Sequence, residues 1–72
     1  MTTFEIVKSI IVKKGYMPAH MVKQDTNLFN HMKTYDILDI VSELQEMLNT
    51  PIQEKYLTNV FTVRDLIRAY QS

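Results

Sequence analysis

Half of the acidic residues in this chain recur along one stretch at the spacing of a helix face. Four of the eight acids are separated by steps of three, four and three residues: Asp36, Asp39, Glu43 and Glu46. Side chains three or four positions apart lie on the same face of an α-helix. We therefore expect a stripe of carboxylates that attracts and orients a basic partner. The alternative is a solvated helix face with no partner.

An apolar stripe in the same stretch predicts the helix that carries these acids. Its members also recur at steps of three and four, and they lie on the face opposite the acids: Ile37, Ile40, Val41, Leu44 and Leu48. Such a pattern is typical of an amphipathic helix packed on a core. We expect the helix to run from Thr34 to Leu48 and to stop before Pro51, because proline cannot continue a helix.

Two further helices are indicated by their start signals. Thr2 followed by Glu5 fits a capping box and predicts a helix over residues 3–14, ended by Gly15. Thr62 followed by Asp65 predicts a last helix up to residue 70, with an apolar face formed by Val63, Leu66, Ile67 and Tyr70. Residues 53–58 are expected to form one short helical turn.

Residues 16–33 form a long connection between the first two main helices. Pro18 and the run 25–27 disfavour helix there. We expect the apolar side chains of the connection to pin it onto the core: Met21, Val22, Leu28 and Phe29. The predicted fold is therefore all-α, with three main helices, one short helix and a long first loop.

Composition limits the classes of protein to consider. The chain has 72 residues, no cysteine and 46% apolar residues, so we expect one domain over residues 1–72, stabilised by helix packing. It has no apolar run long enough to span a membrane and no signal peptide, and we expect a cytoplasmic monomer. Residues 1–35 hold five lysines against two acids, and residues 36–72 hold six acids against three bases. A dipolar chain with an acidic helix does not favour nucleic-acid binding.

The apolar spacing resembles that of the acyl carrier protein family. If Thr34 takes the place of that family's serine, the family's apolar positions fall on apolar or aromatic residues: Tyr35, Leu38, Ile40, Val41, Leu44, Leu48 and Ile52. The stretch 62–70 resembles the start of the family's last helix, and Pro18, Met21, Asp25 and Leu28 resemble its first loop. The resemblance implies a small four-helix bundle that docks on biosynthetic enzymes through its second helix, with no catalytic activity of its own.

The attachment point departs from the family pattern. The resemblance implies a 4'-phosphopantetheine arm, added by a phosphopantetheinyl transferase to the serine of an Asp-Ser-Leu motif, but this chain has Lys33 and Thr34 at the first two positions. The extra methyl of threonine crowds its hydroxyl, and the oxygen can instead cap the helix. Two alternatives follow. The chain is a non-carrying binding or scaffold relative, which these changes favour, or a working carrier of acyl or aminoacyl groups modified on Thr34.

Several further residues have side chains that could contact a partner, bind a metal or take part in catalysis. Beside the four acids, the resemblance implies that Tyr35 and Met47 contact the partner, although Tyr35 could instead close the core. His20 and His31, near Asp25, lack the short spacing of a metal site, and no serine or cysteine is arranged for catalysis. We therefore expect that the chain binds no metal ion and is not an enzyme. A small DNA-binding or membrane-surface module remains a further alternative.

Overall fold

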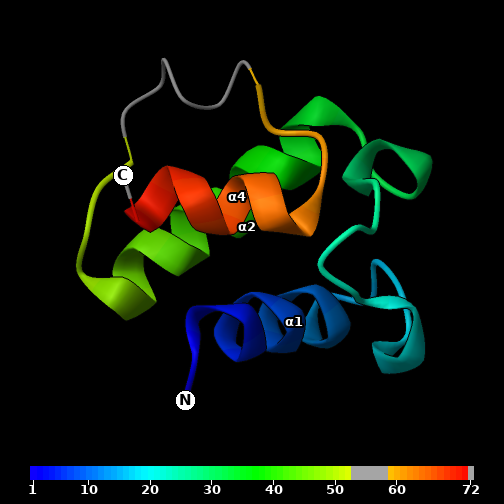
Figure 1. Ribbon diagram of the computed structural model, residues 1–72, viewed down its shortest axis with the longest axis horizontal. Helices are drawn as coiled ribbons and strands as arrows, with labels where there is room; N and C mark the ends of the chain where they lie inside the picture. Colours follow the sequence, from blue (N-terminus) through cyan, green and yellow to red (C-terminus); the bar gives the residue numbers. More distant parts are fainter. Residues whose placement is uncertain (53–58, 72) are drawn as a thin grey trace.

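The computed structural model describes residues 1–52 and 59–71, and its regular elements are helical (Figure 1). They are α1 (Thr3–Lys13), the 3-10 turns η1 (Ala19–Met21) and η2 (Leu28–Asn30), α2 (Thr34–Leu48) and α4 (Val63–Gln71). The all-α prediction with three main helices is confirmed. The short helix expected over residues 53–58 lies outside the described residues.

The start and end signals of α1 act as the sequence predicts. Thr2 Oγ1 accepts the Glu5 N–H at 3.2 Å, and the Glu5 carboxylate accepts the Thr2 N–H at 3.2 Å, which completes a capping box. At the other end Gly15 has φ 80°, and the N–H groups of Gly15 and Tyr16 donate to Val12 and Ile11. This is the Schellman pattern, which turns the chain out of the helix. The helix ends at Lys13, one residue earlier than expected.

The bounds of α2 agree with the prediction at both ends. Its C-cap Asn49 lies in the left-handed region at φ 51° and ψ 37°, a conformation that asparagine tolerates better than most residues. Pro51 follows two residues later and prevents further helix. These signals act within a few residues, which is why the sequence locates the C-terminal end of α2.

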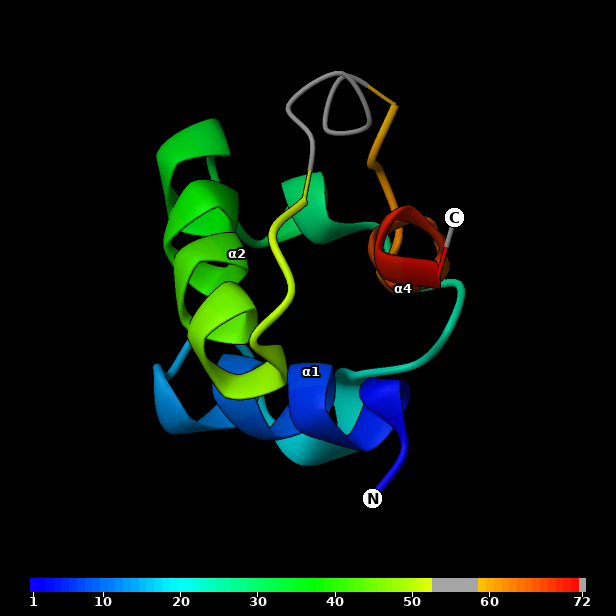
Figure 2. The ribbon, with the colours of Figure 1, turned by 90° about the vertical axis from the view of Figure 1, so that its left-hand side faces the viewer.

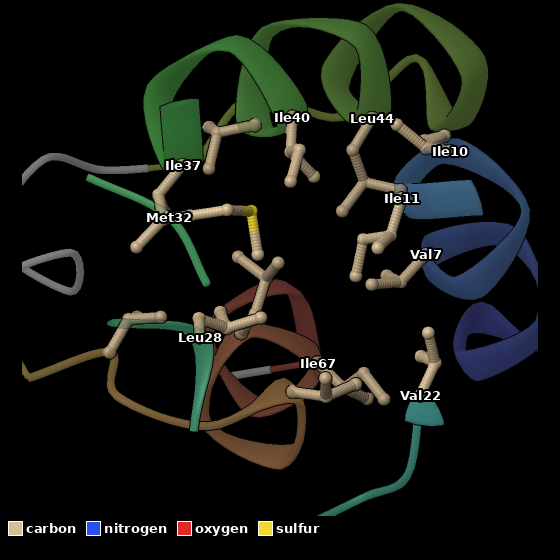
Figure 3. Packing of buried hydrophobic residues seen from close by; sticks show 14 of the residues in the cluster. Val7, Ile10, Ile11, Val22, Leu28, Met32, Ile37, Ile40, Leu44 and Ile67 are labelled. Atoms are coloured by element: carbon tan, nitrogen blue, oxygen red, sulfur yellow. The ribbon is translucent and has the colours of Figure 1, made fainter. Parts of the chain in front are cut away.

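The three helices surround a common apolar core, and α1 packs against both α2 and α4 (Figure 2). Buried side chains of all three helices point toward one another (Figure 3). The helical core residues are Val7, Ile10, Ile11, Ile37, Ile40, Val41, Leu44, Val63, Leu66 and Ile67. The apolar faces predicted from periodicity therefore do form the core. Tyr70 is half-buried, and its hydroxyl donates to the Val41 carbonyl at 3.1 Å, joining α4 to α2.

The first connection is pinned to the core by a different set of residues from the one expected. Val22 and Leu28 are buried as predicted, but Met21 and Phe29 are 37% and 44% exposed. The other anchors are Met17 and Met32, which are both buried. Met21 and Phe29 lie in the turns η1 and η2 and are exposed there, whereas Leu28, also in η2, is buried. The prediction for these two residues was wrong because short turns have no long apolar period that separates inside from outside.

Backbone hydrogen bonds fasten the first connection to the entrance of α4. The Leu28 N–H donates to the Phe61 carbonyl at 2.8 Å. In the other direction, the N–H groups of Val63 and Arg64 donate to carbonyls of the connection at 3.2 and 2.9 Å. Because the first N–H groups of a helix lack partners inside the helix, these bonds hold both the connection and the start of α4.

Candidate functional site on the second helix

Thr34 lies at the entrance of α2, as its first helical residue. The extended residue before it, Lys33, is the N-cap, with φ −98° and ψ 171°. The prediction that Thr34 itself caps the helix was wrong, because helical backbone begins at Thr34 and not after it. Thr34 is exposed, and its hydroxyl makes no hydrogen bond with any residue in the described ranges.

The first turn of α2 uses Asp36 in place of a capping threonine. The Asp36 carboxylate accepts the Lys33 N–H at 2.9 Å, which is half of a capping box. The other half needs a side-chain acceptor on the N-cap residue, and the lysine ammonium only donates. One of the four acids of the stripe therefore contributes to the local structure of α2.

The two central acids of the stripe contact the basic end of α1. Lys14 Nζ lies 2.9 Å from Asp39 Oδ2 and 3.0 Å from Glu43 Oε2. Lys13 Nζ lies 3.0 Å from Glu43 Oε1, and the Tyr16 hydroxyl donates to Asp39 Oδ2 at 3.2 Å. Half of the stripe is thus paired within the molecule. Sequence reasoning missed this contact, because the period of each helix does not indicate which side chains of the other helix lie beside it.

These ion pairs shift the titration of the groups that form them. Hydrogen bonding from Lys14 lowers the pKa of both the Asp39 and Glu43 carboxyls, and Lys13 adds to the effect on Glu43. Conversely, Asp39 and then Glu43 raise the pKa of Lys14. Both carboxyls are therefore ionised at neutral pH, and positive charge lies directly beside them.

The remaining predicted contact residues of α2 are exposed. Tyr35 is 67% exposed, so the alternative in which it closes the core was wrong. Met47 is 54% exposed, and Glu46 is exposed without an ion pair to any described residue. Among the seven apolar positions shared with the carrier pattern, Leu38 is also exposed, at 48%. The helix thus leaves large apolar side chains in solvent.

Phe29 and Phe61 form an aromatic pair that the sequence did not predict. The rings of Phe29 and Phe61 lie with centroids 6.0 Å apart at 53°, and both side chains are about half exposed. The hydrogen bond from Leu28 to the Phe61 carbonyl brings the two segments together. Because they are far apart in the sequence, no local signal indicates this pair.

The histidines show no arrangement for metal chemistry. His20 and His31 are both exposed, and the described residues hold no group of three or more His, Cys, Asp or Glu side chains suited to a metal ion. None of the helices in the described ranges is both long and apolar enough to cross a bilayer.

Comparison with known proteins points to one family. No protein-family model matches the chain. It is 26% identical over 69 residues to the acyl carrier protein of Helicobacter hepaticus, an alignment that covers 93% of this chain and 91% of the relative. That alignment supports the resemblance in apolar spacing, and the helical structure agrees with the fold it implies. The chain is acyl carrier protein-like in sequence, and its described residues form a helical bundle of the acyl carrier protein type.

Proposed function

We propose that this chain is an acyl carrier protein-like domain that docks on biosynthetic enzymes through α2, in a binding or scaffold role that does not require a phosphopantetheine arm. Its similarity to an acyl carrier protein over 93% of its length supports a carrier-type protein rather than a catalyst. Partners with basic docking surfaces fit the acids of α2.

The exposed surface of α2 is the observation that carries the docking proposal. Tyr35 and Met47 remain 67% and 54% exposed on a helix whose other face is buried. Large apolar side chains that remain exposed along one helix offer contacts to a partner. Glu46 adds a carboxylate that no described residue pairs, so it is available to a basic side chain of a partner.

The change in charge beside Thr34 supports the non-carrying role. Lys33 takes the place where the carrier pattern has an acid, and it precedes Thr34 directly. A transferase that recognises a negative charge there meets a positive one. The threonine methyl adds steric crowding at the oxygen that must attack in line.

A working carrier modified on Thr34 is the second candidate, and one observation favours it. The Thr34 hydroxyl is exposed and is not used to cap α2. When bound, a phosphopantetheine arm would supply the thiol that holds an acyl or aminoacyl group as a thioester. The role of this chain would be to present the Thr34 oxygen at the entrance of α2.

Intact mass separates the two candidates. The full chain is co-expressed with a permissive phosphopantetheinyl transferase, beside Thr34→Ala and Thr34→Ser variants. We expect no added mass for the natural chain and for Thr34→Ala, and the mass of one arm for Thr34→Ser. An added arm on the natural chain that is lost in Thr34→Ala would replace the non-carrying role with the second candidate.

Docking is tested by changing residues whose side chains form no hydrogen bond or ion pair with the described residues. The double variant Tyr35→Ala/Glu46→Lys should weaken capture of a biosynthetic enzyme encoded beside this gene. The matched control Met21→Ala/Asp25→Lys makes the same kinds of change on the exposed first connection and should leave capture unchanged. Equal capture by both variants would exclude α2 as the docking element.

A further inference from the structure

Lys13 and Lys14 occupy two of the carboxylates on the proposed docking surface. We propose that they form an autoinhibitory contact, so that a basic partner reaches Asp39 and Glu43 by displacing them. This inference rests on the proposed docking function and adds a control on its affinity. Lys13 and Lys14 together form an internal competitor for the partner.

The two lysines of the internal competitor lie close to the carboxylate oxygens of Asp39 and Glu43. Both carboxylate oxygens of Glu43 are within 3.0 Å of a lysine Nζ, and the Glu43 side chain is only 22% exposed. Lys14 bridges Asp39 and Glu43 with a side chain that is 23% exposed. Because each oxygen of Glu43 already has a lysine partner and little of the side chain is exposed, a partner cation that contacts Glu43 competes with the two lysines for the same oxygens.

Exchange is physically feasible because the contacts lie at the surface. Lys13 is 72% exposed and Asp39 is 51% exposed, so water and a partner can approach both. Surface ion pairs contribute little stability each and cost side-chain entropy. An arginine guanidinium can contact a carboxylate with two parallel hydrogen bonds, whereas a lysine ammonium acts as a point charge. An arginine-bearing partner can thus outcompete the lysines.

The hydrogen bond from Tyr16 to Asp39 can remain in place while a partner displaces the lysines. The Tyr16 hydroxyl donates to Asp39 Oδ2 at 3.2 Å and comes from the segment after α1, not from a lysine. If Lys14 leaves, this bond still orients the Asp39 carboxylate. The internal competitor can move while the partner meets a carboxylate that is already positioned.

Displacement of the two lysines by a partner should alter how the binding affinity depends on salt concentration. Salt weakens the ion pairs inside the molecule and those with a partner alike. When one set replaces the other, the two effects partly cancel. Affinity should therefore depend less on salt than it would for an open acidic stripe, and removal of the internal competitor should make the salt dependence steeper.

The test uses a defined basic probe. The probe is an amidated helical alanine peptide with arginine at every third or fourth position, and the same peptide with glutamine in place of arginine is the reference. Binding to the full chain is measured by calorimetry at low and at physiological salt. Lys13→Gln/Lys14→Gln should bind the arginine peptide about two- to fivefold more tightly, as expected for the loss of a few surface pairs.

A matched variant separates local competition from net charge. Lys8→Gln/Lys23→Gln removes the same total charge from residues that form no ion pair within the described ranges, and its affinity should change less than that of Lys13→Gln/Lys14→Gln. An equal gain in both variants, or no gain in either, would overturn the internal competitor. If the arginine peptide binds no variant better than the glutamine peptide, the docking function itself fails.

A measurement on the natural chain covers the case in which the double variant does not fold. Nuclear magnetic resonance follows the Lys14 side chain during addition of the arginine peptide. Displacement predicts that its signals move toward those of a free lysine as the carboxylate signals of Asp39 and Glu43 change. Carboxylate changes without any change at Lys14 would overturn the proposal even where the peptide binds.

Discussion

α2 and α4 begin in opposite ways. At the start of α4, Thr62 Oγ1 accepts the Asp65 N–H at 3.1 Å, and the Asp65 carboxylate accepts two N–H groups, from Phe61 and Thr62, at 3.0 Å each. At the start of α2, the N-cap side chain is a lysine ammonium, which accepts no hydrogen bond, and the Asp36 carboxylate accepts one helix-entrance N–H, from Lys33. The start of α4 therefore has both halves of a capping box, whereas the start of α2 has only one of them.

The same contrast extends to tertiary contacts. The next two N–H groups of α4, from Val63 and Arg64, donate to carbonyls of the first connection. Thr34 and Tyr35, which begin α2, are both exposed. The α4 entrance is hydrogen-bonded to the first connection, while the α2 entrance leaves a hydroxyl and an aromatic ring in solvent. The weaker start therefore coincides with the residues proposed to meet partners.

The largest expected effect comes from removing the acceptor at the tighter entrance. Asp65→Ala leaves the Phe61 and Thr62 N–H groups without their carboxylate and should lower the free energy of unfolding by about 1–3 kcal/mol. Asp36→Ala removes one bond to an exposed N–H and should cost less than about 1 kcal/mol. Urea unfolding of both variants measures the difference. Equal losses would contradict the contrast between the two entrances.

The two threonines provide the next comparison. Thr62→Ala removes a capping oxygen and should cost about 1 kcal/mol. Thr34→Ala removes an exposed hydroxyl without a described hydrogen bond, and the stability should change by less than about 0.5 kcal/mol. Thermal unfolding of both variants in one buffer gives the answer. A loss at Thr34 as large as the one at Thr62 would mean that the Thr34 hydroxyl stabilises the helix after all.

Local sequence signals predicted most of the helical framework. The Thr2–Glu5 and Thr62–Asp65 pairs, Gly15 and the run before Pro51 each act within a few residues, so their effects can be inferred without tertiary structure. The buried faces of the helices likewise follow from their period. The cap of α2 was misplaced by one residue because Lys33 has a poor capping side chain and the neighbouring threonine has a good one.

Contacts between distant segments could not be predicted in this way. The pairing of Lys14 with Asp39 and Glu43 depends on how α1 lies beside α2, and the pattern of neither helix contains that information. In the first connection, Met17 and Met32 are buried while Met21 is exposed, although all three are the same residue type. Without a sustained period, residue type alone does not separate the core from the surface.

Completing the capping box of α2 should change the free energy of unfolding by a smaller amount, in the stabilising direction. Lys33→Asp supplies the missing acceptor at the N-cap and places a negative charge at the positive end of the helix dipole. We expect stability to rise by about 0.5–1 kcal/mol, measured by urea unfolding. Lys23→Asp makes the same charge change in the first connection and should give no such gain. If both substitutions act alike, total charge rather than capping explains the result.

The smallest expected effect is the acid dependence of the two complete caps. Burial acts to raise the pKa of Asp65, but hydrogen bonds from Phe61 and Thr62 and the charge of Arg68 outweigh it and lower the pKa. Hydrogen bonds from Thr2 lower the pKa of Glu5. A carboxyl with a lowered folded-state pKa stabilises the protein above its unfolded-state pKa, and this contribution is lost as pH falls through the folded-state value.

Stability should therefore decline below about pH 4.5, near the ordinary carboxyl values. Asp65→Asn should flatten this decline more than Glu5→Gln does, because Asp65 is partly shielded from water whereas Glu5 is exposed. Melting temperatures recorded from neutral to acidic pH measure both slopes. A steeper acid loss attributable to Glu5 than to Asp65 would show that the α1 entrance, and not the α4 entrance, is the one the fold depends on more strongly.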